Sequence, residues 1–255
     1  MPHDQASGTY YEVHGQGTPL LLGFPILASH AQVFGEAAGP IRDGFLERLT
    51  DRYRVLLMDY PSIGRSRDIA PELLTADRVC ADLLSVASAA GFGGFIYWGY
   101  SWGAAAGLQL ASRSDRLLGL VIGGWPPLGA QYADVLAAVE EQMDDPPPEV
   151  QVVLRSSAQY AQWAAFYRSI DTWPEERAAR STACPRLAFA GADGDVYAGT
   201  RLIRNASILR ARKEELEAMG WRVELIPGKG HSVGLEPETV VPVVRAFLDS
   251  EFPDD

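Results

Sequence analysis

The stretch FIYWGYSWGAAAGL, residues 95–108, decides the fold of this chain. It begins with an apolar run, residues 95–99, that is typical of a strand covered on both faces. The motif Gly99-Tyr100-Ser101-Trp102-Gly103 follows, and then small residues that favour a helix. In a sharp strand-to-helix turn, a side chain at either flanking glycine would clash with neighbouring backbone. Such a turn exposes the Ser101 hydroxyl and places the Trp102 backbone N–H at a helix start, where it can donate to an oxyanion.

Short apolar runs elsewhere in the chain predict further strands. Between them lie helical patterns, for example Val79, Leu83, Val86 and Ala90, and others over residues 200–219 and 239–252. Residues 14–17 are predicted to form a hairpin turn. Alternating strands and helices predict an α/β fold with an open, mostly parallel sheet. The other predicted strands cover residues 10–13, 19–22, 54–58, 117–122, 186–190 and 222–226.

Residues 126–182 break this alternation, because they contain no pattern of a buried strand. Tyr160, Trp163 and Tyr167 recur at the spacing that places side chains on one face of a helix. We therefore expect a small helical cap inserted between a first core part, residues 1–125, and a second core part, residues 183–255. The cap aromatics either line a substrate pocket or only pack the cap onto the core. Trp125, Tyr160 and Trp163 are the candidate substrate-binding residues.

A serine hydroxyl is a weak nucleophile and needs a base, which the histidines of the chain can supply. His231 lies in the loop that directly follows the last predicted strand. Ligands of open α/β sheets bind beyond the carboxyl ends of the strands, so Ser101 and His231 can converge there. The other three histidines are His3 near the terminus, His14 in the predicted turn, and His30 several residues beyond a strand.

The base needs a carboxylate that orients its ring and stabilises the imidazolium. Asp193 and Asp195 both follow the strand predicted at residues 186–190, and either could serve. We favour Asp195, since aspartate followed by glycine, as in Asp193-Gly194, is common in turns. The order serine, acid, histidine is then that of the enzymes with a nucleophile elbow.

With these motifs, the sequence resembles the α/β-hydrolase family over nearly its whole length. Residues 99–103 resemble the nucleophile elbow, and Gly228-Lys229-Gly230-His231 resembles the Gly-x-Gly-His ending of the family. Leu22-Gly23-Phe24-Pro25 resembles its oxyanion loop, and residues 59–66 resemble its Asp-x-Arg-Gly-x-Gly-x-Ser loop. The resemblance implies an α/β-hydrolase fold, a mostly parallel central sheet with flanking helices and a small helical cap.

The resemblance also implies roles for single residues. Ser101 would be the nucleophile, His231 the base and Asp195 the acid. The backbone N–H groups of Phe24 and Trp102 would form the oxyanion hole.

The sequence departs from the family pattern at three places. Leu22 stands where the family usually has histidine, so the oxyanion loop is expected to be held differently. Pro61-Ser62-Ile63 replaces the usual Arg-Gly-His of the second loop. The family's acid lies three residues after a glycine, and that place is Gly194 here, with an aspartate on either side.

Serine at the elbow disfavours the relatives that use aspartate there, the haloalkane dehalogenases and epoxide hydrolases. We expect a hydrolase that cleaves a carboxylic ester, lactone or thioester of a small, partly apolar molecule through an acyl-enzyme. Two alternatives on the same fold are a non-hydrolytic protein that binds a small molecule and an accessory acyl-transfer protein.

The composition of the chain limits which kinds of molecule it is expected to bind. The chain has 255 residues and a formal net charge of −11, which argues against nucleic acid and against anionic membrane surfaces. Two cysteines, Cys80 and Cys184, cannot form a disulfide scaffold, and no cluster has the spacing of a zinc site, so we expect no metal and no cofactor. We find no secretory signal and no membrane span, and expect a cytoplasmic protein. The oligomeric state stays open, a homodimer included. Asn205-Ala206-Ser207 matches the glycosylation acceptor pattern only by chance.

Overall fold

The fold is built on a seven-stranded sheet in the order β1-β3-β2-β4-β5-β6-β9. The computed structural model describes residues 3–24, 38–148 and 156–253. Strand β1 is antiparallel to β3, and the remaining neighbours pair in parallel. Each strand of this seven-stranded sheet overlaps a predicted one, so the mostly parallel sheet is confirmed. The strands are β1 (Tyr11–His14), β2 (Thr18–Leu22), β3 (Tyr53–Met58), β4 (Phe95–Tyr100), β5 (Leu117–Gly123), β6 (Arg186–Gly191) and β9 (Arg222–Ile226).

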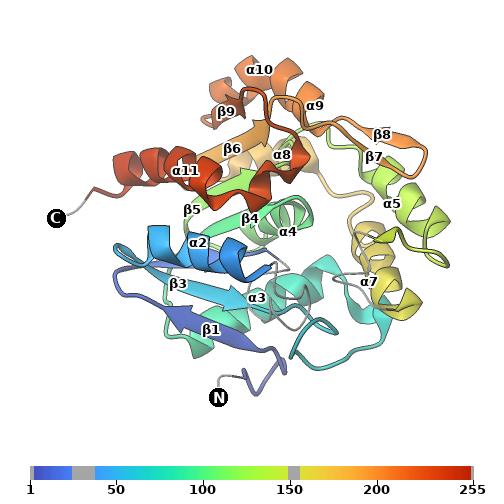
Figure 1. Ribbon diagram of the computed structural model, residues 1–255, viewed down its shortest axis with the longest axis horizontal. Coiled ribbons are helices and arrows are strands. Elements are labelled where there is room, and N and C mark those ends of the chain that lie inside the picture. Colours follow the sequence, from blue (N-terminus) through green and yellow to red (C-terminus); the bar gives the residue numbers. More distant parts are fainter. Residues whose placement is uncertain (1–2, 25–37, 149–155, 254–255) are drawn as a thin grey trace.

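Helices cover both faces of this sheet (Figure 1). Helices α2 (Gly39–Leu49) and α11 (Pro237–Glu251) pack against each other over one face. Helices α3 (Ala76–Ala89) and α4 (Trp102–Ala111) lie on the opposite face. The central strands are therefore buried from both sides, which explains why their sequences are apolar almost throughout.

Strand β4 shows how alternate side chains of a central strand pack on opposite faces of the sheet. Ile96 and Trp98 join the buried cluster under α2 and α11, whereas Phe95 and Tyr97 join the cluster under α3 and α4. All four side chains are fully buried. Burial of one such side chain stabilises the fold by ~1.5–3 kcal/mol. This packing fixes the strand that carries the motif at residues 99–103.

The predicted hairpin at residues 14–17 is wrong. The turn does join β1 to β2, with Gly15 and Gly17 at positive φ, but β3 lies between these two strands. Tyr11 pairs with Met58 and Leu20 pairs with Val55. The sequence of a turn determines the local path of the chain, whereas the pairing partner comes from a segment about forty residues further on.

Helices lie between β5 and β6, in the segment that was expected to form a cap, and the described ones have these bounds. They are α5 (Tyr132–Glu141), α7 (Ser157–Arg168) and α8 (Glu175–Ser181). Helices α5 and α7 pack against each other, and both lie to one side of the sheet in Figure 1. Within the described ranges, no helix is both long enough and apolar enough for a membrane span.

The single helix expected over residues 200–219 is also wrong. This stretch contains strand β8 (Arg201–Ile203), helix α9 (Asn205–Ala211) and helix α10 (Lys213–Ala218). Gly199, at φ +60°, turns the chain so that β8 pairs with β7 (Val196–Ala198). The resulting hairpin is tied to α5, because Arg201 forms ion pairs with Asp134 and Glu141.

Candidate active site

Ser101 lies on the turn between β4 and α4, at φ 54° and ψ −120°. This conformation is strained for a residue with a side chain, and such strain is stored at functional sites. A Cβ on Gly99 would lie 2.2 Å from the Gly103 carbonyl oxygen, and a Cβ on Gly103 would lie 2.1 Å from the Gly23 carbonyl oxygen. The expected need for glycine on both sides of the serine is confirmed.

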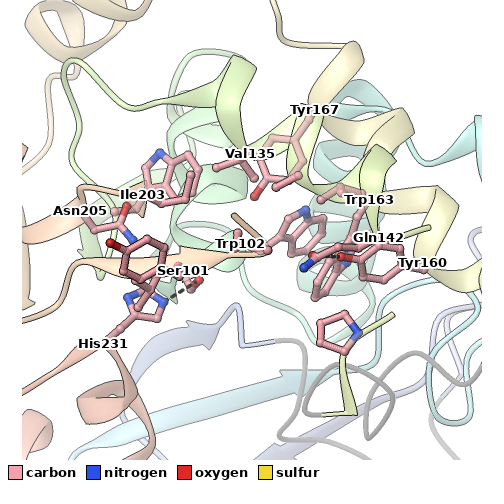
Figure 2. A pocket seen from close by; sticks show the side chains of 18 residues that line it. Ser101, Trp102, Val135, Gln142, Tyr160, Trp163, Tyr167, Ile203, Asn205 and His231 are labelled. Atoms are coloured by element: carbon pink, nitrogen blue, oxygen red, sulfur yellow. Dashed lines mark hydrogen bonds between the residues drawn. The ribbon is translucent and has the colours of Figure 1, made fainter. Parts of the chain in front are cut away.

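His231 lies beside Ser101, at the start of the short helix η3 (His231–Leu235) that follows β9. Its Nε2 atom is 3.1 Å from Ser101 Oγ, which is hydrogen-bonding distance (Figure 2). The Tyr100 hydroxyl donates a 2.6 Å hydrogen bond to the His231 carbonyl oxygen and so holds the loop. The sequence prediction that these two residues converge is confirmed.

Among the described residues, the other ring nitrogen of His231 has no hydrogen-bond partner. Nδ1 is buried and makes no hydrogen bond within the described part of the chain. Burial lowers the pKa of His231 from 6.5 to about 4, because a charged ring would be poorly solvated there. No carboxylate raises it again.

The predicted acid, Asp195, does not contact His231. One carboxylate oxygen accepts hydrogen bonds from the backbone N–H groups of Ala206 and Ser207, each at 2.9 Å, and the other accepts from the Ser207 hydroxyl. Asp195 therefore holds the start of α9 instead of orienting the base. The predicted contact is corrected: both carboxylate oxygens of the aspartate accept hydrogen bonds from residues of α9, and neither is hydrogen-bonded to the imidazole.

Asp193 does not replace it. Its side chain is exposed, while its backbone N–H donates to the Lys229 carbonyl oxygen. The residue next to His231 is Gly194, since a Cβ built there would lie 3.6 Å from the His231 backbone nitrogen. The displacement of both aspartates by one residue from the family position thus leaves the ring without a carboxylate.

Two backbone amides lie where an oxyanion could bind. The Trp102 N–H begins α4, and the Phe24 N–H follows the end of β2. A Cβ on Gly103 would lie 3.8 Å from Phe24 N, so the two segments are adjacent. Neither amide donates a hydrogen bond to another described residue. Pro25, which completes this motif, and His30 lie outside the described residues.

Two buried tyrosines hold these segments. The Tyr60 hydroxyl donates to the Gly23 carbonyl oxygen at 3.1 Å, and the Tyr97 hydroxyl donates to the Gly103 carbonyl oxygen at 2.7 Å. Burial raises the pKa of both tyrosines, so both remain protonated donors. This pair supports the loop in which Leu22 replaces the usual histidine.

A cavity of about 220 Å³ opens beside Ser101 and His231 (Figure 2). The predicted residues Trp125, Tyr160 and Trp163 all line it. Trp163 also stacks on Trp102, with ring centroids 6.4 Å apart and planes 16° apart. Trp163 therefore packs α7 against α4 and also forms a wall of the cavity, which are the two roles that the sequence suggested for these aromatics.

The sequence pattern of the alpha/beta hydrolase family matches residues 13–243. The chain belongs to this family. A search of curated proteins gives a relative from Azorhizobium caulinodans, named "Putative carbamate hydrolase RutD", that is 34% identical over 126 residues. That match spans 48% of this chain and 43% of the relative, so it covers less than half of either protein.

Solved structures share the fold at low identity. An esterase from Thermogutta terrifontis superposes with a TM-score of 0.68 at 21% identity, over 95% of this chain and 93% of the esterase. The N-acyl homoserine lactonase AidH superposes with a TM-score of 0.68 at 17% identity, over 97% and 94%. These likenesses concern the fold alone.

The sequence did not predict several residues that line the cavity of this α/β-hydrolase. Asn205, Ile203 and Tyr197 line the cavity from the β7–β8 hairpin and the start of α9. They were missed because this stretch carries apolar residues at a spacing that favours one helix. Gln142, at the end of α5, lines the cavity too, and a single polar residue beyond a helix gives no signal in the sequence.

Proposed function

We propose that this protein is a serine hydrolase that cleaves a carboxylic ester, lactone or thioester of a small, partly apolar molecule through an acyl-enzyme. One observation carries the proposal: the Ser101 hydroxyl lies 3.1 Å from His231 Nε2 on a strained turn at the wall of an apolar cavity. The names of the curated relative and of the esterase and lactonase relatives agree with hydrolysis of an acyl group.

In the proposed reaction, Ser101 Oγ attacks the carbonyl carbon while His231 Nε2 takes its proton. The amides of Phe24 and Trp102 stabilise the negative charge on the carbonyl oxygen. One such donor accelerates a reaction by ~10²–10³-fold. The tetrahedral intermediate collapses, and His231 returns the proton to the leaving alcohol or thiol. Water then attacks the acyl-enzyme carbonyl and gives a proton to His231. The second tetrahedral intermediate collapses, His231 returns this proton to Ser101 Oγ, and the carboxylic acid leaves.

A second candidate function is small-molecule binding without turnover. The observation that favours it is His231 Nδ1, which has no acceptor within the described ranges. A proton on Nδ1 would be a buried donor without a partner, so the neutral ring is more stable with its proton on Nε2. That tautomer donates to Ser101 and cannot take its proton.

The deciding experiment is covalent labelling by a small fluorophosphonate, measured as intact mass, with Ser101→Ala as the control variant. A hydrolase gains one adduct per chain, and the adduct is absent from Ser101→Ala. A folded wild-type protein that gains no adduct has no activated serine, and the result would favour the binding function. The accessory acyl-transfer alternative predicts labelling together with a preference for thioesters over the matching oxygen esters.

A further inference from the structure

Asn205 is a buried polar residue at the wall of the cavity that nothing in the proposed reaction uses. It is the first residue of α9 and only 5% exposed. It lines the cavity at the end where Ser101 and His231 lie (Figure 2). Among the described residues its side-chain amide has no hydrogen-bond partner. The amide atoms are accessible from the cavity, so they can bind a polar group of a ligand or an ordered water there.

Hydrogen bonds to the residues that follow Asn205 fix the backbone that carries it. Asp195 accepts hydrogen bonds from the next two backbone N–H groups, those of Ala206 and Ser207. Ala206 is buried against the core. The burial of Asn205 also explains why the glycosylation-like tripeptide at residues 205–207 is no surface site. Asp195, which the sequence offered as the acid, thus holds the backbone next to a residue that lines the same cavity as Ser101.

The remaining walls of the cavity carry no formal charge. No described residue that lines it is Asp, Glu, Lys or Arg. Its opposite end is formed by Tyr160 and Gln142, where the tyrosine hydroxyl donates to Gln142 Oε1 at 3.0 Å (Figure 2). An ionised group in this cavity would lose its water and find no counter-charge. Since the described lining residues offer no counter-charge, we expect the occupant to be uncharged.

The volume limits the size of that occupant. An apolar protein cavity of ~150 Å³ holds one benzene molecule. The cavity here measures about 220 Å³ and is walled by Trp102, Trp125, Trp163 and Tyr167. It has room for one ring with a few further atoms.

We propose that Asn205 is a specificity-determining residue. It binds a hydroxyl, carbonyl or amide next to the reacting carbonyl of an uncharged, ring-sized ester. The inference deepens the proposed function and rests on it in one respect, that the bound molecule is an ester. The cavity, the lack of charged residues in its described lining and the amide without a partner are evidence about binding alone. A substrate without a polar group at this point displaces water from Asn205 and replaces none of its hydrogen bonds.

The test compares methyl mandelate with methyl phenylacetate, which differ by one hydroxyl on the carbon next to the ester carbonyl. The wild-type protein is expected to prefer methyl mandelate by about tenfold in kcat/KM. In Asn205→Leu the ratio is expected to fall to about one, because the leucine has a similar size and no polar atom. Equal kcat/KM values for the two esters in the wild-type protein would overturn the inference.

Gln162→Leu is the matched control. Gln162 is a buried amide on α7 whose Nε2 also has no partner, but it does not line the cavity. The mandelate preference should stay at the wild-type value in this variant. If both leucine variants lose the preference together, the effect comes from general loosening and Asn205 has no specific role.

A binding measurement separates this inference from the proposed function. The affinities of Ser101→Ala for the same two esters are obtained by NMR titration, where no turnover occurs. A tenfold preference for methyl mandelate supports the role of Asn205, even if fluorophosphonate labelling of the wild-type protein fails. Equal affinities contradict it, whatever the labelling shows. Binding of monomethyl succinate more tightly than dimethyl succinate would contradict the uncharged occupant.

Discussion

Asp195 offers the sharpest test at the scale of single residues. As the residue that holds α9, it needs only acceptors for two backbone N–H groups, and asparagine keeps one oxygen for them. Asp195→Asn should therefore retain activity within about tenfold of the wild type. The same change in a triad acid costs ~10⁴-fold in kcat. Ester hydrolysis by Asp195→Asn and by Asp193→Asn decides between the two roles, and a loss of that larger size in either variant would identify it as the acid.

The pH dependence of Ser101 reactivity should report that His231 Nδ1 has no carboxylate partner among the described residues. The ring acts as a base only when neutral, and burial lowers its pKa from 6.5 to about 4. The rate of fluorophosphonate labelling should therefore rise with pH through about 4 and be level by about pH 6. A carboxylate that reaches Nδ1 in the working protein would stabilise the imidazolium. The rise would then occur near or above pH 6.5, and such a profile would show that the site rearranges.

The sequence predicted those site residues whose neighbours impose strict geometry. Ser101 needs glycines on both sides, and His231 needs a loop after the last strand, so both could be read from spacing. The acid could not, because two aspartates flank the expected position and a one-residue offset turns the carboxylate toward α9. Asn205 could not either, since its exposure to the cavity depends on how a hairpin packs against α5.

At the scale of elements, the contact between α4 and the end of β2 determines whether the oxyanion amides lie together. A Cβ on Gly103 would meet the Gly23 carbonyl oxygen at 2.1 Å, and neither backbone can easily move. Gly103→Ala should therefore push α4 away from β2 and separate the Trp102 and Phe24 amides. The expected loss is at least ~100-fold in labelling rate, together with a lower melting temperature.

Gly93→Ala is the control for this change, since no atom lies within 4 Å of the added Cβ. Its labelling rate should stay within about twofold of the wild type, because nothing near the site moves. Labelling of Gly103→Ala at the rate of this control would contradict the proposed arrangement of the two amides.

The strands were predictable because burial on both faces leaves a continuous apolar run in the sequence. Strand order was not, since β3 enters between β1 and β2 and that pairing depends on distant segments. The division of residues 200–219 into a strand and two helices was missed for a related reason. Apolar residues at helical spacing also suit a short strand followed by a helix, and the turn at Gly199 decides between these structures.

At the scale of the whole molecule, the net charge of −11 should influence how substrates arrive. Charges on the surface act over roughly 10 Å at moderate salt and are screened when salt is added. The kcat/KM for monomethyl succinate should rise several-fold between ~0.01 M and ~0.5 M salt, whereas that for dimethyl succinate should stay within about twofold. No change for the anionic ester would mean that its exclusion arises inside the cavity, where screening by salt is weak.

Three of the six tryptophans in the chain, Trp102, Trp125 and Trp163, line the cavity. Indole emission is sensitive to the polarity and the quenching groups around the ring. A molecule that enters the cavity displaces water from three fluorophores at once. The protein therefore carries its own optical reporter, and ligands can be screened by intrinsic fluorescence without a dye, a label or a chromogenic leaving group.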